Sequence, residues 1–100
     1  MRVVFTEIAE QTQEKIIEFL ANQWTEKEIA VFLNDVENLL HDLENDKFRM
    51  YQKYSKTIRS ALIGKNHVRV YFQKNNNSLI KILLFFDVRE DPNKLFDYIK

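Results

Sequence analysis

The chain has 100 residues, 45% of them apolar, which is enough for one packed domain but too few for two. It contains no cysteine, which excludes disulfides, thiolate metal sites and cysteine catalysis. Its 15 basic and 15 acidic residues cancel, so it lacks the strong positive balance that is typical of nucleic-acid-binding proteins of this size.

The neutral total combines two oppositely charged halves. Residues 1–50 contain 5 basic and 11 acidic side chains, whereas residues 51–100 contain 10 and 4. From Lys47 to Phe86 there are nine Lys or Arg residues and no Asp or Glu. This asymmetry indicates a cationic surface that binds a polyanionic or acidic partner.

No segment predicts export or membrane insertion. The N-terminal sequence reaches the acidic Glu7 too soon for a signal peptide. The longest apolar run, residues 82–86, is far shorter than the roughly 20 residues that span a bilayer. We therefore expect a cytoplasmic protein.

The first half of the chain predicts a strand and two helices. Arg2–Phe5 is a β-branched and aromatic run, and Glu7–Gln23 has Ile8, Ile16, Ile17 and Leu20 at helical spacing. Thr25 and Glu28 form a capping box for a second helix that continues to about Asn45. Its apolar stripe consists of Ile29, Phe32, Leu33, Val36, Leu39, Leu40 and Leu43. The short connection predicts an antiparallel hairpin, with Trp24 as a packing plug at its corner.

The second half predicts a meander of three strands. After a connector at 49–56, the expected strands are Ile58–Ile63, 68–74 and 78–87, separated by turns at 64–66 and 75–77. The apolar third strand is expected inside the sheet. Asp91 then caps a short helix, with Pro92 at its first position. The whole chain is thus one α+β domain, β-α-α-β-β-β, with a helical hairpin packed on one face of a small antiparallel sheet and a short C-terminal helix.

Alternation along the strands predicts which side chains share the open sheet face. Arg69 and Tyr71 point away from Val68, Val70 and Phe72. Lys81 and Asp87 share a parity that Arg89 extends, and Arg59 joins them if the register permits. The expected partner-binding or anion-binding residues are therefore Arg59, Arg69, Tyr71, Lys81 and Arg89.

The element order and three segments resemble the RelE/ParE superfamily of bacterial toxins. These segments are Ile58-Arg59-Ser60-Ala61-Leu62-Ile63-Gly64, His67-Val68-Arg69-Val70-Tyr71-Phe72 and Phe85-Phe86-Asp87-Val88-Arg89-Glu90-Asp91-Pro92, the last being similar to the closing strand of the ParE-like branch. The resemblance implies the toxin of a type II toxin–antitoxin system, a class associated with plasmid stabilization. It also implies a cognate antitoxin protein as partner in a toxin–antitoxin hetero-oligomer.

The family contains two chemistries, and the residues distinguish them. RelE-like members cut mRNA on the ribosome, which needs a base, an acid and cations near the scissile phosphate. The catalytic candidates here are His67, Arg69, Asp87 and Arg89. The usual arginine position aligns with Val68, beside Arg69, and Asp87 stands where many relatives have histidine. These departures favour the ParE-like branch, which binds DNA gyrase instead.

Structural interpretations compete with these roles. His67 is also readily explained as an exposed turn residue, and Asp87 as a partner of Arg89 or Arg69. No spacing predicts a metal site, and no cofactor motif is present. Three hypotheses follow: a ParE-like toxin that acts by protein–protein interaction, a RelE-like ribosome-dependent endoribonuclease, or a degenerate, non-toxic member that acts only as a binding partner.

Overall fold

The computed structural model describes residues 1–23 and 25–99. The expected role of Trp24 therefore lies outside the described residues. In chain order the elements are β1 (Arg2–Phe5), α1 (Glu7–Gln23), α2 (Glu26–Glu44), the 3-10 helix η1 (Phe48–Met50), β2 (Gln52–Lys53), β3 (Ile58–Ile63), β4 (Val68–Asn76), β5 (Leu79–Asp87) and α3 (Asn93–Ile99).

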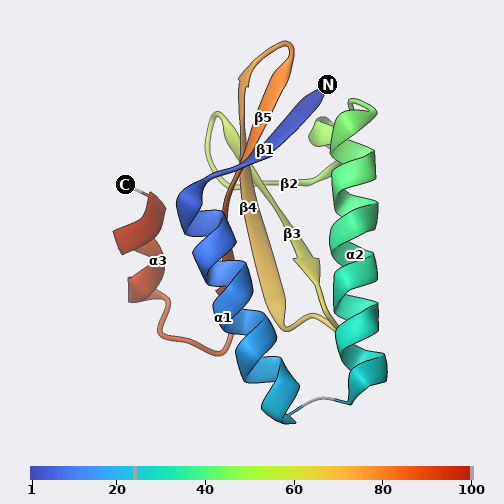
Figure 1. Cartoon of the computed structure of the whole chain (residues 1–100). Coiled ribbons are helices and arrows are strands. Elements are labelled where there is room, and N and C mark those ends of the chain that lie inside the picture. The colour runs from blue at the N-terminus through green and yellow to red at the C-terminus, as the bar shows by residue number, and fades with distance from the viewer. Residues whose placement is uncertain (24, 100) are drawn as a thin grey trace.

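The strands form one sheet with helices on both faces (Figure 1). Its order is β1-β5-β4-β3-β2, and the predicted α+β architecture and element order are confirmed. The sheet is mixed rather than wholly antiparallel, because β1 pairs with β5 in parallel. The helical hairpin and strands β2 to β4, which separate β1 from β5 in the sequence, provide the long crossover that a parallel pair requires. As expected from its apolar run, β5 lies inside the sheet, between β1 and β4.

The main core lies between the helical hairpin and the sheet. Its largest fully buried side chains include Phe32, Phe72, Leu20 and Leu43. The buried stripe of α1 is Ala9, Thr12, Ile16 and Leu20, so the expectation for Ile8 is wrong, since Ile8 is 38% exposed. Ile8 and Ala9 are both at a stripe spacing from Thr12, and the first turn of α1 buries Ala9 rather than Ile8.

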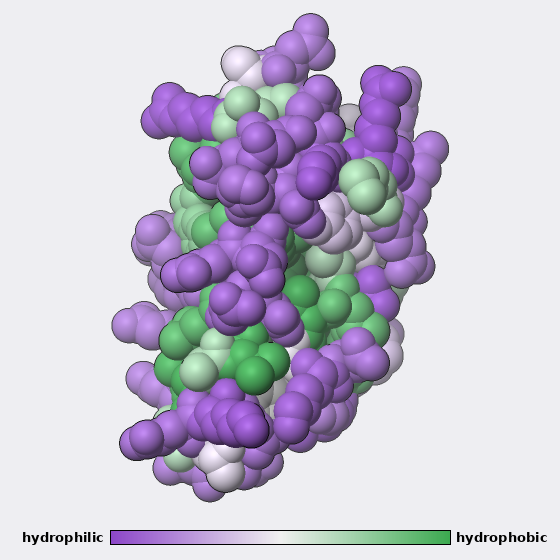
Figure 2. Space-filling view, turned by 90° about the vertical axis from the view of Figure 1, so that its right-hand side faces the viewer, coloured by the Kyte–Doolittle hydropathy of each residue, from purple (hydrophilic) through white to green (hydrophobic). Residues whose placement is uncertain are grey.

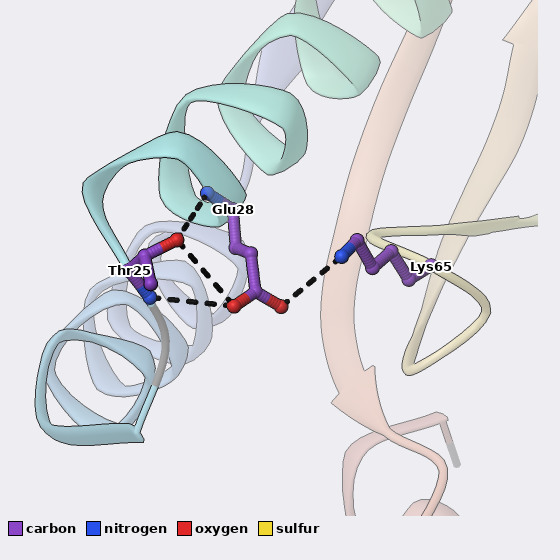
Figure 3. A network of polar contacts seen from close by, with 3 residues as sticks. All are labelled: Thr25, Glu28 and Lys65. Atoms are coloured by element: carbon purple, nitrogen blue, oxygen red, sulfur yellow. Dashed lines mark hydrogen bonds and ion pairs between the residues drawn. The ribbon is translucent and has the colours of Figure 1, made fainter.

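The predicted capping box at the start of α2 is confirmed and extends to the sheet. The Thr25 hydroxyl accepts a hydrogen bond from the Glu28 amide, and the Glu28 carboxylate accepts one from the Thr25 amide (Figure 3). Lys65, in the β3–β4 turn, donates to the other oxygen of Glu28 at 3.2 Å. These contacts, above all the hydrogen bond from Lys65, lower the pKa of the Glu28 carboxyl. The box therefore joins α2 to the sheet as well as starting the helix.

Two threonines replace a missing strand beside β5. Pairing between β1 and β5 ends at Phe5 and Ile82, so the rest of that edge of β5 has no strand partner. The Thr6 hydroxyl donates to the Leu83 carbonyl, and the Thr12 hydroxyl accepts from the Phe85 amide at 3.0 Å. Buried backbone groups require such partners. Side chains at the start of α1 thus supply hydrogen-bond partners to the part of the β5 edge that β1 does not reach.

A β-bulge in β5 changes the predicted faces of the sheet. Tyr71 pairs with Leu84, but the next residue of β4, Phe72, pairs with Ile82, so Leu83 is an extra residue. An extra residue reverses the alternation of all positions beyond it. Lys81, opposite Gln73, therefore lies on the face away from the hairpin. Asp87, opposite the core residue Val68, lies on the hairpin side.

The second face carries a smaller core beneath α3. Ile58, Tyr71, Leu84, Phe86 and Leu95 form this cluster. The Asp91 carboxylate accepts a hydrogen bond from the Asn93 amide, which confirms the predicted cap. The face that was expected to be open is thus partly covered.

The two hairpin turns differ in how well the sequence located them. Gly64, Lys65 and Asn66 all have positive φ, between 55° and 67°, which agrees with the predicted tight turn. The Asn-rich turn falls later than expected, because Asn75 and Asn76 belong to β4. No helix within the described residues is both long and apolar enough to cross a membrane.

Candidate functional site

Two of the predicted cationic residues, Arg69 and Lys81, lie on the face away from the helical hairpin. Arg69 is opposite Leu62, and Lys81 is opposite Gln73. The Arg69 guanidinium donates to the Ser60 hydroxyl at 3.0 Å and to the Gln52 side-chain oxygen at 3.1 Å. Both partners are neutral, so they orient the positive charge without cancelling it.

Tyr71 lies on the same face but belongs to the second core. Its side chain is 5% exposed, and its ring meets the Tyr54 ring edge-on at a centroid distance of 5.2 Å. Burial raises the pKa of the Tyr71 hydroxyl. The ring is therefore used for packing under α3, and it presents no face on which a base can stack.

Arg59 lies on the opposite side of the sheet from Arg69. It pairs with the core residue Phe72, so the register does not bring it to the predicted face. Its Nη1 atom donates to the carbonyls of Tyr51 at 2.9 Å and Arg49 at 3.3 Å. Its Cζ atom lies 5.5 Å from the centroid of the Phe48 ring. Arg59 is therefore held in one orientation at the end of the sheet.

Asp87 and Arg89 form a two-point ion pair beside α1. The Nε and Nη2 atoms of Arg89 donate to the two carboxylate oxygens of Asp87 at 3.0 and 2.8 Å. The hydrogen bonds from Arg89, assisted by the charge of His67, lower the pKa of Asp87. Arg89 also lies 5.3 Å above the ring of Phe19 on α1. Asp87 is thus an ionised partner of Arg89 and is poorly suited to hold a proton as a general acid.

The structure brings three of the four catalytic candidates together and leaves Arg69 apart from them. Asp87 and Arg89 lie against α1, and the carbonyl of half-buried His67 accepts a hydrogen bond at 3.0 Å from the amide of Val88, which lies between them in the sequence. Arg69 faces away from the hairpin. No group of three or more potential His, Cys, Asp or Glu metal ligands occurs among residues 1–23 and 25–99. A base, an acid and a phosphate-binding cation converging on one point are the requirement for RNA cleavage. Here Arg89 occupies both carboxylate oxygens of Asp87, and Arg69 lies on the other face of the sheet, so the candidates do not offer a free acid and a free cation at one point.

The main concentration of positive charge is a hollow at the end of the sheet where η1 and the β4–β5 turn meet. We call it the basic hollow, and it has a volume of about 450 Å³. Its lining contains four cations, Arg49, Lys56, Arg59 and Lys74, together with Phe48, Thr57, Asn76 and Asn77. In Figure 1 this end of the sheet is uppermost, beside the C-terminal end of α2. The acid-free stretch of the sequence thus concentrates its charge at a strand end.

Sequence reasoning identified Arg59 but missed Arg49, Lys56 and Lys74. Pairing of antiparallel strands places the start of β3 beside the end of β4, and the Lys74 amide donates to the Thr57 carbonyl at 3.2 Å. The predicted meander already implied this arrangement, because the start of one strand and the end of the antiparallel strand paired with it lie at the same edge of the sheet. No sequence pattern indicated that η1 would bring Arg49 to the same place.

The face over α2 has a different character. It is largely hydrophilic in its upper half, while hydrophobic side chains gather in its lower half (Figure 2). Exposed apolar residues of α2 include Val31 and Leu33.

No protein-family model matches the chain, and no curated protein matches it either.

Proposed function

We propose that this chain is the toxin component of a type II toxin–antitoxin system and resembles the ParE-like branch of the RelE/ParE superfamily. It would arrest growth by binding a cellular target, with DNA gyrase as the first candidate, and a cognate antitoxin would neutralise it. A cytoplasmic location belongs to the same proposal. The support for the family is the order of elements, a strand, a helical hairpin, a three-strand meander and a short helix.

The observation that carries binding rather than cleavage is that the candidate acid is already paired with a candidate cation. Arg89 neutralises Asp87, and Arg69 lies on the opposite face of the sheet from Asp87. Proton transfer requires the acid or base within hydrogen-bond reach of the reacting atom. Recognition by charge has no such requirement, since oriented cations act over several ångströms.

A growth assay tests the proposal directly. The gene is induced alone and together with its neighbouring reading frame, and we expect arrest only in the first case. A supercoiling assay then tests gyrase, and mapping of ribosome-bound mRNA tests cleavage. Cleavage that is lost in Arg69→Ala would replace the ParE-like proposal by the RelE-like endoribonuclease. Absence of arrest would leave the non-toxic binding partner as the better reading.

A further inference from the structure

Positive charge in the basic hollow exceeds what the chain's own acids neutralise. Its lining includes no Asp or Glu. Lys74 lies 3.6 Å from the carboxylate of Asp46, but the Asp46 side chain is 74% exposed. Such an exposed pair contributes little binding energy and exchanges readily with other anions. Within the described residues, Arg49, Lys56 and Arg59 have no ion pair. The hollow is therefore available to an external anion.

Arg59 is already oriented for such a ligand. Both of its hydrogen bonds use Nη1, so Nε and Nη2 have no hydrogen-bond partner among the described residues. These two donors form the edge of a guanidinium that matches a carboxylate. Because backbone carbonyls and the Phe48 ring fix the group, binding costs little additional conformational entropy.

The lining favours a peptide over single-stranded nucleic acid. Binding of single strands relies on aromatic faces that stack with bases. Phe48 is the one aromatic residue in the lining, and it is only 6% exposed. The charged groups of Arg59 and Lys74 both lie over its ring, 5.5 and 5.9 Å from the centroid. The Asn76 side-chain oxygen accepts from Ser78, which leaves its amide donors, and those of Asn77, for peptide carbonyls.

We propose that the basic hollow binds an acidic peptide segment of a partner protein. Glutamate or aspartate side chains pair with Arg59 and with the two exposed cations, Arg49 and Lys56, while the asparagine amides contact the peptide backbone. A volume of about 450 Å³ suits a few side chains of an extended segment. The identification of the partner as the antitoxin rests on the proposed function, whereas the charge chemistry does not.

Fluorescence anisotropy of a labelled peptide of alternating glutamate and serine tests the site. We expect saturable binding by the wild-type protein and about tenfold weaker binding by the double variant Arg49→Ala/Lys56→Ala. The matched control, Lys15→Ala/Lys27→Ala, removes two exposed lysines from the helices and should bind like wild type. Arg59→Lys keeps the positive charge but removes the paired donors of the guanidinium, so it should also weaken binding.

The outcomes separate this inference from the proposed function. Equal loss in both double variants would show attraction without a site and would overturn the inference, as would absence of peptide binding. Tighter binding of an oligouridylate with the same net charge would assign the hollow to nucleic acid instead. Growth arrest without peptide binding refutes the inference alone. Hollow-dependent peptide binding by a protein that does not arrest growth refutes only the toxin proposal.

Discussion

Thr12 connects helix α1 to strand β5 through a buried hydrogen bond. Its hydroxyl donates to the Ile8 carbonyl at 2.7 Å and accepts from the Phe85 amide. In Thr12→Val the shape is kept, but the Phe85 amide is left without a partner. We expect a loss of about 1–3 kcal/mol in the free energy of unfolding.

Urea denaturation measures this loss, and Thr12→Ser is the control. Serine retains the hydroxyl and gives up only a methyl group, so it should retain more of the stability than valine does. If valine is as stable as wild type, Thr12 does not supply the missing edge of β5.

The Asp87–Arg89 pair predicts how stability responds to acid. Hydrogen bonds from Arg89 lower the pKa of Asp87 in the folded state. As the pH falls below about 4, the unfolded chain therefore takes up a proton before the folded one does. The stability that the pair contributes is fully present above this pH and is lost as the pH falls through the folded-state pKa.

Asp87→Asn removes this titration. We expect the variant to be less stable than wild type at neutral pH and its stability to fall less steeply in acid, so the two curves converge. Urea unfolding over a pH series measures both curves. Arg89→Ala should give the same shallower slope, and parallel curves for wild type and both variants would contradict the assignment.

Among the secondary-structure elements, α3 is held to the sheet by its buried residue Leu95, with partly buried Ile99 packed beside it. Leu95 is 9% exposed and joins Ile58, Tyr71, Leu84 and Phe86 in the second core, whereas its neighbour Phe96 is 58% exposed. We expect Leu95→Ala to lower the free energy of unfolding by about 2 kcal/mol. Phe96→Ala, a larger deletion on the same helix, should cost much less. Hydrogen exchange should show faster exchange of α3 amides in Leu95→Ala only.

The elements were largely predictable, but their relative faces were not. The helical hairpin, the capping box at Thr25 and the three-strand meander follow from periodicity and local capping chemistry, which act over a few residues. The bulge at Leu83 has no local signal, because it lies within the continuous apolar run from residue 82 to 86, where alternation between polar and apolar side chains cannot be read. One extra residue therefore separated Lys81 from Asp87.

The sequence predicted which part of the chain carries the positive charge of the candidate site, but it did not predict how those residues come together in space. The acid-free stretch from Lys47 to Phe86 contains every residue that lines the basic hollow. The place where these cations come together depends on η1, which positions Phe48 and Arg49 against the strand ends. A 3-10 helix of three residues is too short to leave a periodic pattern in the sequence. The burial of Tyr71 likewise depends on where α3 packs.

At the scale of the whole molecule, the neutral chain is an electrical dipole. Four exposed glutamates, Glu7, Glu10, Glu14 and Glu18, lie along α1, whereas the basic hollow lies at one end of the sheet. The longest dimension of the molecule is 39 Å, while charges are screened over about 8 Å at physiological ionic strength. An approaching acidic segment therefore responds to the local charge, and the zero total has little influence on it.

This separation predicts that the position of a charge change matters more than its size. Lys56→Glu and Lys27→Glu give the same net charge, but Lys56 lines the basic hollow and Lys27 is in the first turn of α2. The 19 residues of α2 extend about 28 Å, so Lys27 is several screening lengths from the hollow. Only Lys56→Glu should slow association with the acidic peptide, by about tenfold, and the difference should shrink as salt is added. Stopped-flow fluorescence measures these rates, and equal slowing by both substitutions would mean that total charge, rather than the basic hollow, directs the encounter.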